Sequence, residues 1–104
     1  MTVPREKIDA LLTVSVPPSR TREWDEWHHN WRALGPGAAS RLIEVLEHGT
    51  EDEQYSAVIA LRLFGYEVWA DGYGPDYFYE LTEPGAHEKR IIKPKITPEP
   101  YTPL

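Results

Sequence analysis

The hydrophobic pattern of this chain changes its period at Gly65, and that change constrains the fold more than any other feature of the sequence. Ahead of Gly65, apolar residues recur every three or four positions, as in the segment QYSAVIALRLF at 54–64. Beyond Gly65, the segments YEVWA and DYFYELT come nearer to an alternation between two faces. The first spacing is typical of amphipathic helices and the second of strands with one buried face. We therefore expect a helical N-terminal part followed by a small β-sheet.

Four helices are expected before Gly65, because each of four segments carries its own end signals. Pro17 and Pro18 stop the first, since the residue before a proline is pushed out of the helical region. The second ends at the GPG stretch 35–37. The strongest start signal is TEDE, in which Thr50 and Glu53 have the spacing of a capping box. The expected helices cover residues 3–14, 21–34, 38–47 and 50–64.

Three strands are expected after Gly65, and they favour an antiparallel hairpin or a three-stranded meander. The stretches DGYGP and EPGAH separate them, and both are rich in turn-forming residues. Pro94 restricts the last strand to a sheet edge or a bulge, because proline cannot donate a backbone hydrogen bond. The predicted fold class is α+β, with three to four short helices packed on this C-terminal sheet. The expected strands cover residues 66–70, 76–82 and 89–97.

Length and composition favour a single domain. A chain of 104 residues can bury one modest core, which we expect residues 1–97 to form, with the proline-rich segment 98–104 as an extended tail. The absence of cysteine excludes disulfides and thiol catalysis, and it favours a reducing cytoplasm. No stretch approaches the roughly 18 apolar residues of a membrane span, so no membrane partner is expected. The net charge of −6 argues against a nucleic-acid partner.

The two central helices, SRLIEVLEHGTEDEQYSAVIALRLFG at 40–65, carry a further packing pattern. Aliphatic residues recur in the first helix, a short acidic turn follows, and the second helix reads A-x-x-A-L-x-x-F-G. In this arrangement the segment resembles a single HEAT-type repeat. What the resemblance implies is a helical hairpin that serves as a scaffold for protein contacts, with no activity attached. The matching residues are Leu42, Ile43, Leu46, Ala57, Ala60, Leu61, Phe64 and Gly65.

The segment WDEWHHNW at 24–31 raises the question of a metal or acid/base site. Asp25 and His29 are four residues apart, which places both on one helical face, as in zinc-binding helices. A metal site still needs a third protein ligand, and no motif supplies one. At about 100° per residue the tryptophans fall on one stripe, so we expect them to be buried, Asp25 and His29 to face outward, and no metal or other cofactor to bind. The tryptophans are Trp24, Trp27 and Trp31.

The segment YEVWADGYGPDYFYEL at 66–81 interleaves aromatic and acidic residues. Alternation along a strand puts Phe78 on one face and Tyr77 and Tyr79 on the other, so one set can cover the helices. Exposed tyrosine and tryptophan give large contact area at low conformational cost, which suits a recognition surface. The predicted partner-binding residues are Trp69, Asp71, Tyr73, Asp76, Tyr77, Tyr79 and Glu80.

The sequence favours protein binding over catalysis, because no nucleophile, oxyanion loop or paired-acid motif accompanies the abundant carboxylates. The most concrete hypothesis is a small acidic inhibitor, of the immunity-protein or antitoxin type, that covers the basic surface of another protein. One alternative is a small metal-dependent or acid/base enzyme that uses Asp25, His28 and His29. Another alternative is an accessory subunit or scaffold domain in a larger assembly.

Overall fold

The computed structural model describes residues 3–72 and 76–95, and it has the α+β fold that the sequence predicts. Tyr73 and the predicted tail 98–104 lie outside the described residues. The helical part comprises α1 (Arg5–Leu12), α2 (Arg22–Leu34), the short 3-10 helix η1 (Pro36–Ala38), α3 (Ala39–His48) and α4 (Glu51–Leu63). The sheet comprises β1 (Glu67–Asp71), β2 (Phe78–Thr82) and β3 (Arg90–Ile92).

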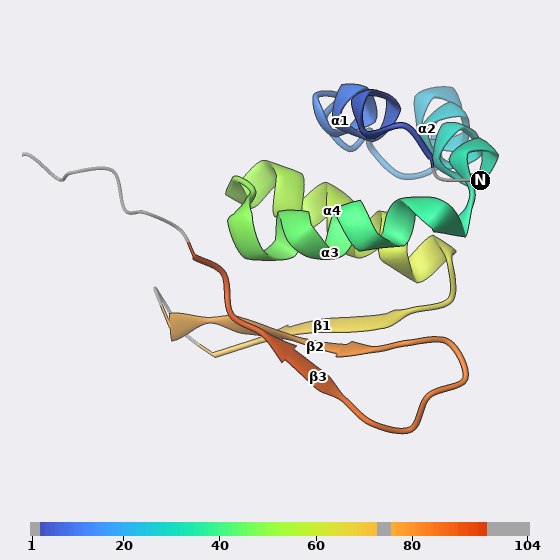
Figure 1. The fold of residues 1–104 in the computed structure, drawn as a ribbon. Coiled ribbons are helices and arrows are strands. Elements are labelled where there is room, and N and C mark those ends of the chain that lie inside the picture. Colours follow the sequence, from blue (N-terminus) through green and yellow to red (C-terminus); the bar gives the residue numbers. More distant parts are fainter. Residues whose placement is uncertain (1–2, 73–75, 96–104) are drawn as a thin grey trace, which may run out of the picture.

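The elements form three layers (Figure 1). The helices α1 and α2 make one outer layer, the α3–α4 hairpin makes the middle layer, and the sheet lies against the hairpin on the other side. One face of the sheet is therefore packed on helices. Its other face has no helix over it in the part of the chain that the structure describes.

Local signals explain where the helices begin and end. The Thr21 hydroxyl accepts a hydrogen bond from the Trp24 backbone N–H and so caps α2. At α4, Thr50 and Glu53 form both bonds of the predicted capping box. The same helix ends in a Schellman arrangement, in which Gly65 has a φ of 91° and the next N–H, that of Tyr66, bonds back to the Leu61 carbonyl. Helix-capping signals therefore fix both ends of α4.

The sheet is an antiparallel meander with the order β1-β2-β3. Val68 pairs with Leu81, and Tyr79 pairs with Ile92; all four side chains are buried against the helices. Because side chains alternate along a strand, the intervening residues point away from the helices. The third strand ends at Ile92, two residues before Pro94, in agreement with the restriction that proline imposes.

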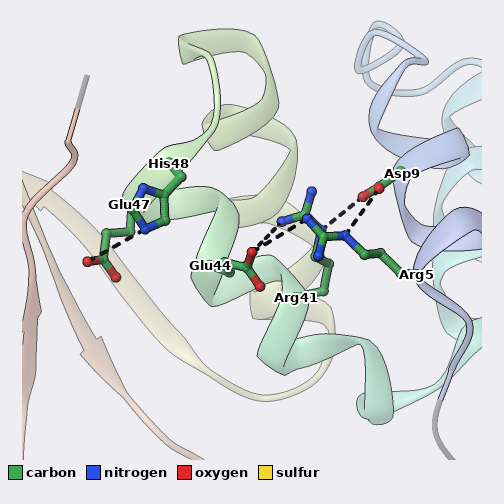
Figure 2. A network of polar contacts seen from close by, with 6 residues as sticks. All are labelled: Arg5, Asp9, Arg41, Glu44, Glu47 and His48. Carbon is green, nitrogen blue, oxygen red and sulfur yellow. Dashed lines mark hydrogen bonds and ion pairs between the residues drawn. The ribbon is translucent and has the colours of Figure 1, made fainter. Parts of the chain in front are cut away.

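Charged residues tie α1 to α3 (Figure 2). The Arg41 side chain, which is mostly buried, lies 2.9 Å from Asp9 and 3.0 Å from Glu44. Arg5 pairs with the same two carboxylates at 3.7 and 3.6 Å. Two cations and two anions therefore neutralise one another, which is the condition under which partly buried charges are tolerated. This cluster joins the outer helical layer to the middle one.

Candidate functional site

The aromatic residues of α2 form a packed cluster on its inner face. Trp31 and Trp27 are buried, and their rings meet edge-to-face with centroids 6.0 Å apart. Trp24 is half-buried at the start of the same stripe. The prediction of one apolar stripe is thus confirmed. The indole N–H groups of Trp27 and Trp31 have no hydrogen-bond acceptor among the described residues, which lowers the stability that their burial provides.

The three residues that the metal-dependent alternative would use do not all face the same way on α2. Asp25 and His29 are exposed, as expected. His28 is half-buried and packs edge-on against Trp24, with ring centroids 4.1 Å apart. Burial lowers the pKa of His28 and the charge of Arg32 lowers it further, while Asp25 acts in the opposite direction. Within residues 3–72 and 76–95, no three His, Asp or Glu side chains converge in a way that could hold a metal ion.

A buried glutamine links α4 to β2. The side chain of Gln54 is fully buried, and its Oε1 atom accepts hydrogen bonds from the hydroxyls of Tyr77 at 2.6 Å and Tyr79 at 2.9 Å. Its Nε2 atom donates to the carbonyl of Gly49 at 2.9 Å. Burial raises the pKa of Tyr79 to about 12, with smaller contributions from Tyr77 and the negative charge of Glu51. Tyr79 therefore approaches Gln54 as a neutral donor.

Above this hydrogen-bonded floor lies an apolar groove of about 810 Å³. One side of the groove is the α2 surface around Trp24 and His28, and the other is the end of the sheet around Ala70 and Tyr77. The length of the groove follows α4, which contributes side chains from each of its turns. The α4 residues in the lining are Glu51, Gln54, Tyr55, Val58, Ile59, Arg62 and Leu63.

A second open surface is the face of the sheet that points away from the helices. Trp69 is 60% exposed and Ile91 is 57% exposed, and both flank Glu80 in one row across the three strands. Glu67 and Asp71 lie on either side of Trp69 along β1, on the same face. We call this surface the outer sheet face; it combines apolar contact area with carboxylates, and its residues are Glu67, Trp69, Asp71, Glu80 and Ile91. The Glu80 carboxylate also lies 3.7 Å from the Lys89 ammonium group.

Arg62 links the groove to the outer sheet face around the edge strand β1. It donates two hydrogen bonds to the Val68 carbonyl, at 3.1 and 2.7 Å, and its guanidinium lies 4.8 Å from the ring centroid of Trp69. Stacking of a guanidinium on an indole is a favourable cation–π contact. Arg62 therefore holds Trp69 in place while leaving most of the ring open to solvent. It also occupies a carbonyl on the sheet edge that another strand could otherwise pair with.

The structure divides the predicted partner-binding residues between these two surfaces. Trp69, Asp71 and Glu80 lie on the outer sheet face, and Asp76 is exposed in the connection to β2. The tyrosines at 77 and 79 point the other way, towards Gln54, and Tyr79 is only 7% exposed, so it offers a partner little contact area. Tyr73 lies outside the described residues.

Sequence reasoning missed Gln54 and Arg62. Gln54 does carry a weak signal, because a polar residue stands three positions before Ala57 on the buried side of a helix. A buried polar side chain needs partners, but the sequence does not show that these are tyrosines 23 and 25 residues away. From the sequence alone, Arg62 cannot be distinguished from an ordinary surface arginine. Its contacts with Val68 and Trp69 depend on the fold, which places β1 alongside α4.

No family model matches the chain, and no curated protein or solved structure is significantly similar to it. The likeness of residues 40–65 to a HEAT-type repeat stays a prediction. None of the helices in the described ranges is both long enough and apolar enough to traverse a membrane.

Proposed function

We propose that this protein is a non-catalytic binding domain that covers the basic surface of another protein with its outer sheet face. The observation that carries the proposal is the exposed Trp69, held by Arg62 and flanked by Glu67 and Asp71. A fixed aromatic ring supplies contact area at a low entropic cost, because little of its freedom remains to be lost on binding. Carboxylates around such a ring favour a partner rich in Lys and Arg.

The overall charge supports a role in association. A chain with a net charge of −6 attracts a basic protein over distances up to the Debye length, about 8 Å at physiological ionic strength. Such attraction raises the association rate more than it raises the affinity. These are the properties of a small acidic inhibitor, of the immunity-protein or antitoxin type. We place its action in the cytoplasm, since a chain without cysteine suits a reducing compartment.

The proposal is tested by capturing partners with the tagged full chain and measuring association kinetics with any basic protein recovered. Reversing the charge at Glu67, Asp71 and Glu80 should slow association about tenfold at low salt and flatten its dependence on ionic strength. The matched control reverses Glu6, Glu23 and Glu26, three acidic residues on α1 and α2. Equal slowing by the two triple variants, or no slowing by the first, would contradict the proposed surface.

Trp69→Ala provides a second test. If the ring is a central contact, its removal should raise the dissociation rate by about tenfold or more while the association rate changes little. A variant in which both rates are unchanged would contradict the role of Trp69. The enzyme and scaffold alternatives stay predictions.

A further inference from the structure

We infer that the groove along α4 is a separate binding site that receives an amphipathic helix carrying Lys or Arg. The inference concerns a different face of the molecule from the outer sheet face. It therefore goes beyond the proposed function, and it holds or fails independently of it.

The shape of the groove favours a helix. Its lining follows α4 from Glu51 to Leu63, and thirteen residues at 1.5 Å each span about 20 Å. An elongated apolar trough of this kind is how proteins receive the apolar face of a partner helix, with anchors spaced every three or four residues. Tyr55 is 60% exposed at its rim although it stands on the same helix as the core residues Ala57 and Leu61. Burial of this exposed apolar surface by a partner is therefore energetically favourable.

The floor of the groove is rigid. Gln54 fixes the hydroxyl groups of Tyr77 and Tyr79, and the two rings meet edge-to-face with centroids 5.8 Å apart. The opposite wall is held by packing, because the His28 ring lies edge-on against Trp24. A partner helix would therefore meet a preformed surface and would not have to order it.

The charges in and beside the groove select a basic helix. Arg62 is the one Lys or Arg side chain among the lining residues that the structure describes; it stands in the last turn of α4, and its guanidinium contacts the Val68 carbonyl and the Trp69 ring. Glu51 makes no ion pair with any described residue, and it lies at the end of the groove where α4 begins. Asp76 is the chain neighbour of the lining residue Tyr77, and it is exposed. The free charge at this end is thus negative, which complements a cationic side chain on the bound helix.

The test uses two synthetic helical peptides with the same leucine spacing, one with lysine and one with glutamate on the polar face. Each peptide carries a fluorophore and is titrated with the full chain, and binding is followed by anisotropy. The Leu/Lys peptide should bind, and Glu51→Lys should weaken its binding about three- to tenfold. Tyr55→Ala should weaken it to a similar extent through lost apolar contact. Equal binding of the two peptides, or no binding of the Leu/Lys peptide, would overturn the inference.

The matched control is Glu67→Lys, which makes the same charge change on the outer sheet face. It should leave peptide binding unchanged; a loss as large as that of Glu51→Lys would mean that the peptide follows general charge, and would overturn the groove as its site. Amide chemical-shift changes should concentrate in α4 and around Trp24 and His28. Shifts confined to the sheet would also overturn the inference.

Two other occupants of the groove are distinguished by two further measurements. A second copy of the chain would show as a concentration-dependent dimer in sedimentation velocity, lost in Tyr55→Ala. An apolar amine would show as binding of dodecylamine below its micelle concentration without binding of the Leu/Lys peptide. Either result would overturn the helix as occupant. Because Tyr55 and Glu51 are exposed, both variants should keep the far-UV circular dichroism spectrum of the original chain.

Discussion

The tryptophans of α2 and the aromatic residues of β1 and β2 stand in equally dense segments of sequence, yet the backbone distributes them differently. In α2, a period of 3.6 places Trp24, Trp27 and Trp31 on one stripe, where each ring packs on the next. In the sheet, a period of two sends Trp69 and Tyr79 to opposite faces. The Trp27 and Trp31 rings are therefore buried in the core, whereas the Trp69 ring is mostly exposed.

The two groups also differ in how their polar atoms are satisfied. The hydroxyls of Tyr77 and Tyr79 share the amide oxygen of Gln54, while the indole N–H groups of Trp27 and Trp31 have no acceptor in the described part of the chain. The α2 cluster therefore gains its stability from packing alone. The tyrosine cluster gains part of it from hydrogen bonds, which fix geometry more strictly than apolar contact does. That difference suits a fixed groove floor.

The largest loss of folding stability is expected from Trp31→Ala. Trp31 is fully buried, so its truncation should lower the free energy of unfolding by about 3–5 kcal/mol through lost transfer energy and a residual cavity. Trp31→Phe should cost less, because it also removes an unpaired N–H. Trp69→Ala is the matched control in the sheet, with an expected cost of about 1 kcal/mol or less. Urea denaturation measures all three, and similar losses for Trp31→Ala and Trp69→Ala would contradict the assignment of Trp31 to the core and Trp69 to the surface.

A smaller effect is expected from Gln54→Leu. This variant replaces the buried amide with an apolar side chain of similar size and leaves the buried Tyr79 hydroxyl and the Gly49 carbonyl without their partner, at a cost of about 2–3 kcal/mol. Tyr77→Phe removes one of the two tyrosine bonds from a half-buried position and should cost about 1 kcal/mol. Denaturation midpoints give the ranking. Unchanged stability in Gln54→Leu would mean that the tyrosine cluster, like the tryptophan cluster, depends on packing alone.

Tyr79 should make the stability of the fold depend on pH in the alkaline range. Because burial raises the pKa of its hydroxyl to about 12 in the folded chain, the unfolded chain loses this proton at lower pH. The contribution of Tyr79 to stability is fully present below its ordinary pKa of 10.0 and is lost as the pH rises to about 12. Denaturation across this window should show a shallower fall in Tyr79→Phe than in the original chain. Parallel curves for the two proteins would contradict the assigned pKa.

The sequence was sufficient for features that depend on near neighbours. The Thr50–Glu53 capping box, the tryptophan stripe and the three antiparallel strands follow from short-range spacing, and the structure confirms them. The third helix differs in detail: η1 precedes it, and α3 begins at Ala39 instead of Ala38, because Pro36 stands at the start of the tighter turn. Such boundaries vary by a residue or two with the cap geometry.

Features that depend on contacts between distant residues could not be predicted from the sequence. Alternation correctly separates Phe78 from Tyr79, but it does not say which face the helices cover. That choice is made by the α3–α4 hairpin, which buries Val68 and Leu81 and thereby turns Trp69 outward. The groove has the same origin, since its lining comes from α2, α4 and the sheet together. Its presence is a property of packing and not of any one segment.

The smallest effect is expected on the polar face of α2, where His29→Ala should change the free energy of unfolding by no more than about 0.5 kcal/mol. His29 is exposed, and the adjacent His28 turns about 100° away along the helix to pack on Trp24. Two neighbouring imidazoles in this arrangement cannot share one ion without unwinding the helix. Isothermal titration with Zn²⁺ should therefore give no stoichiometric binding at micromolar metal. Stoichiometric heat that is lost in His29→Ala would instead favour the metal-dependent enzyme, and would show that the two faces of α2 are not divided between packing and solvent as the tryptophan stripe indicates.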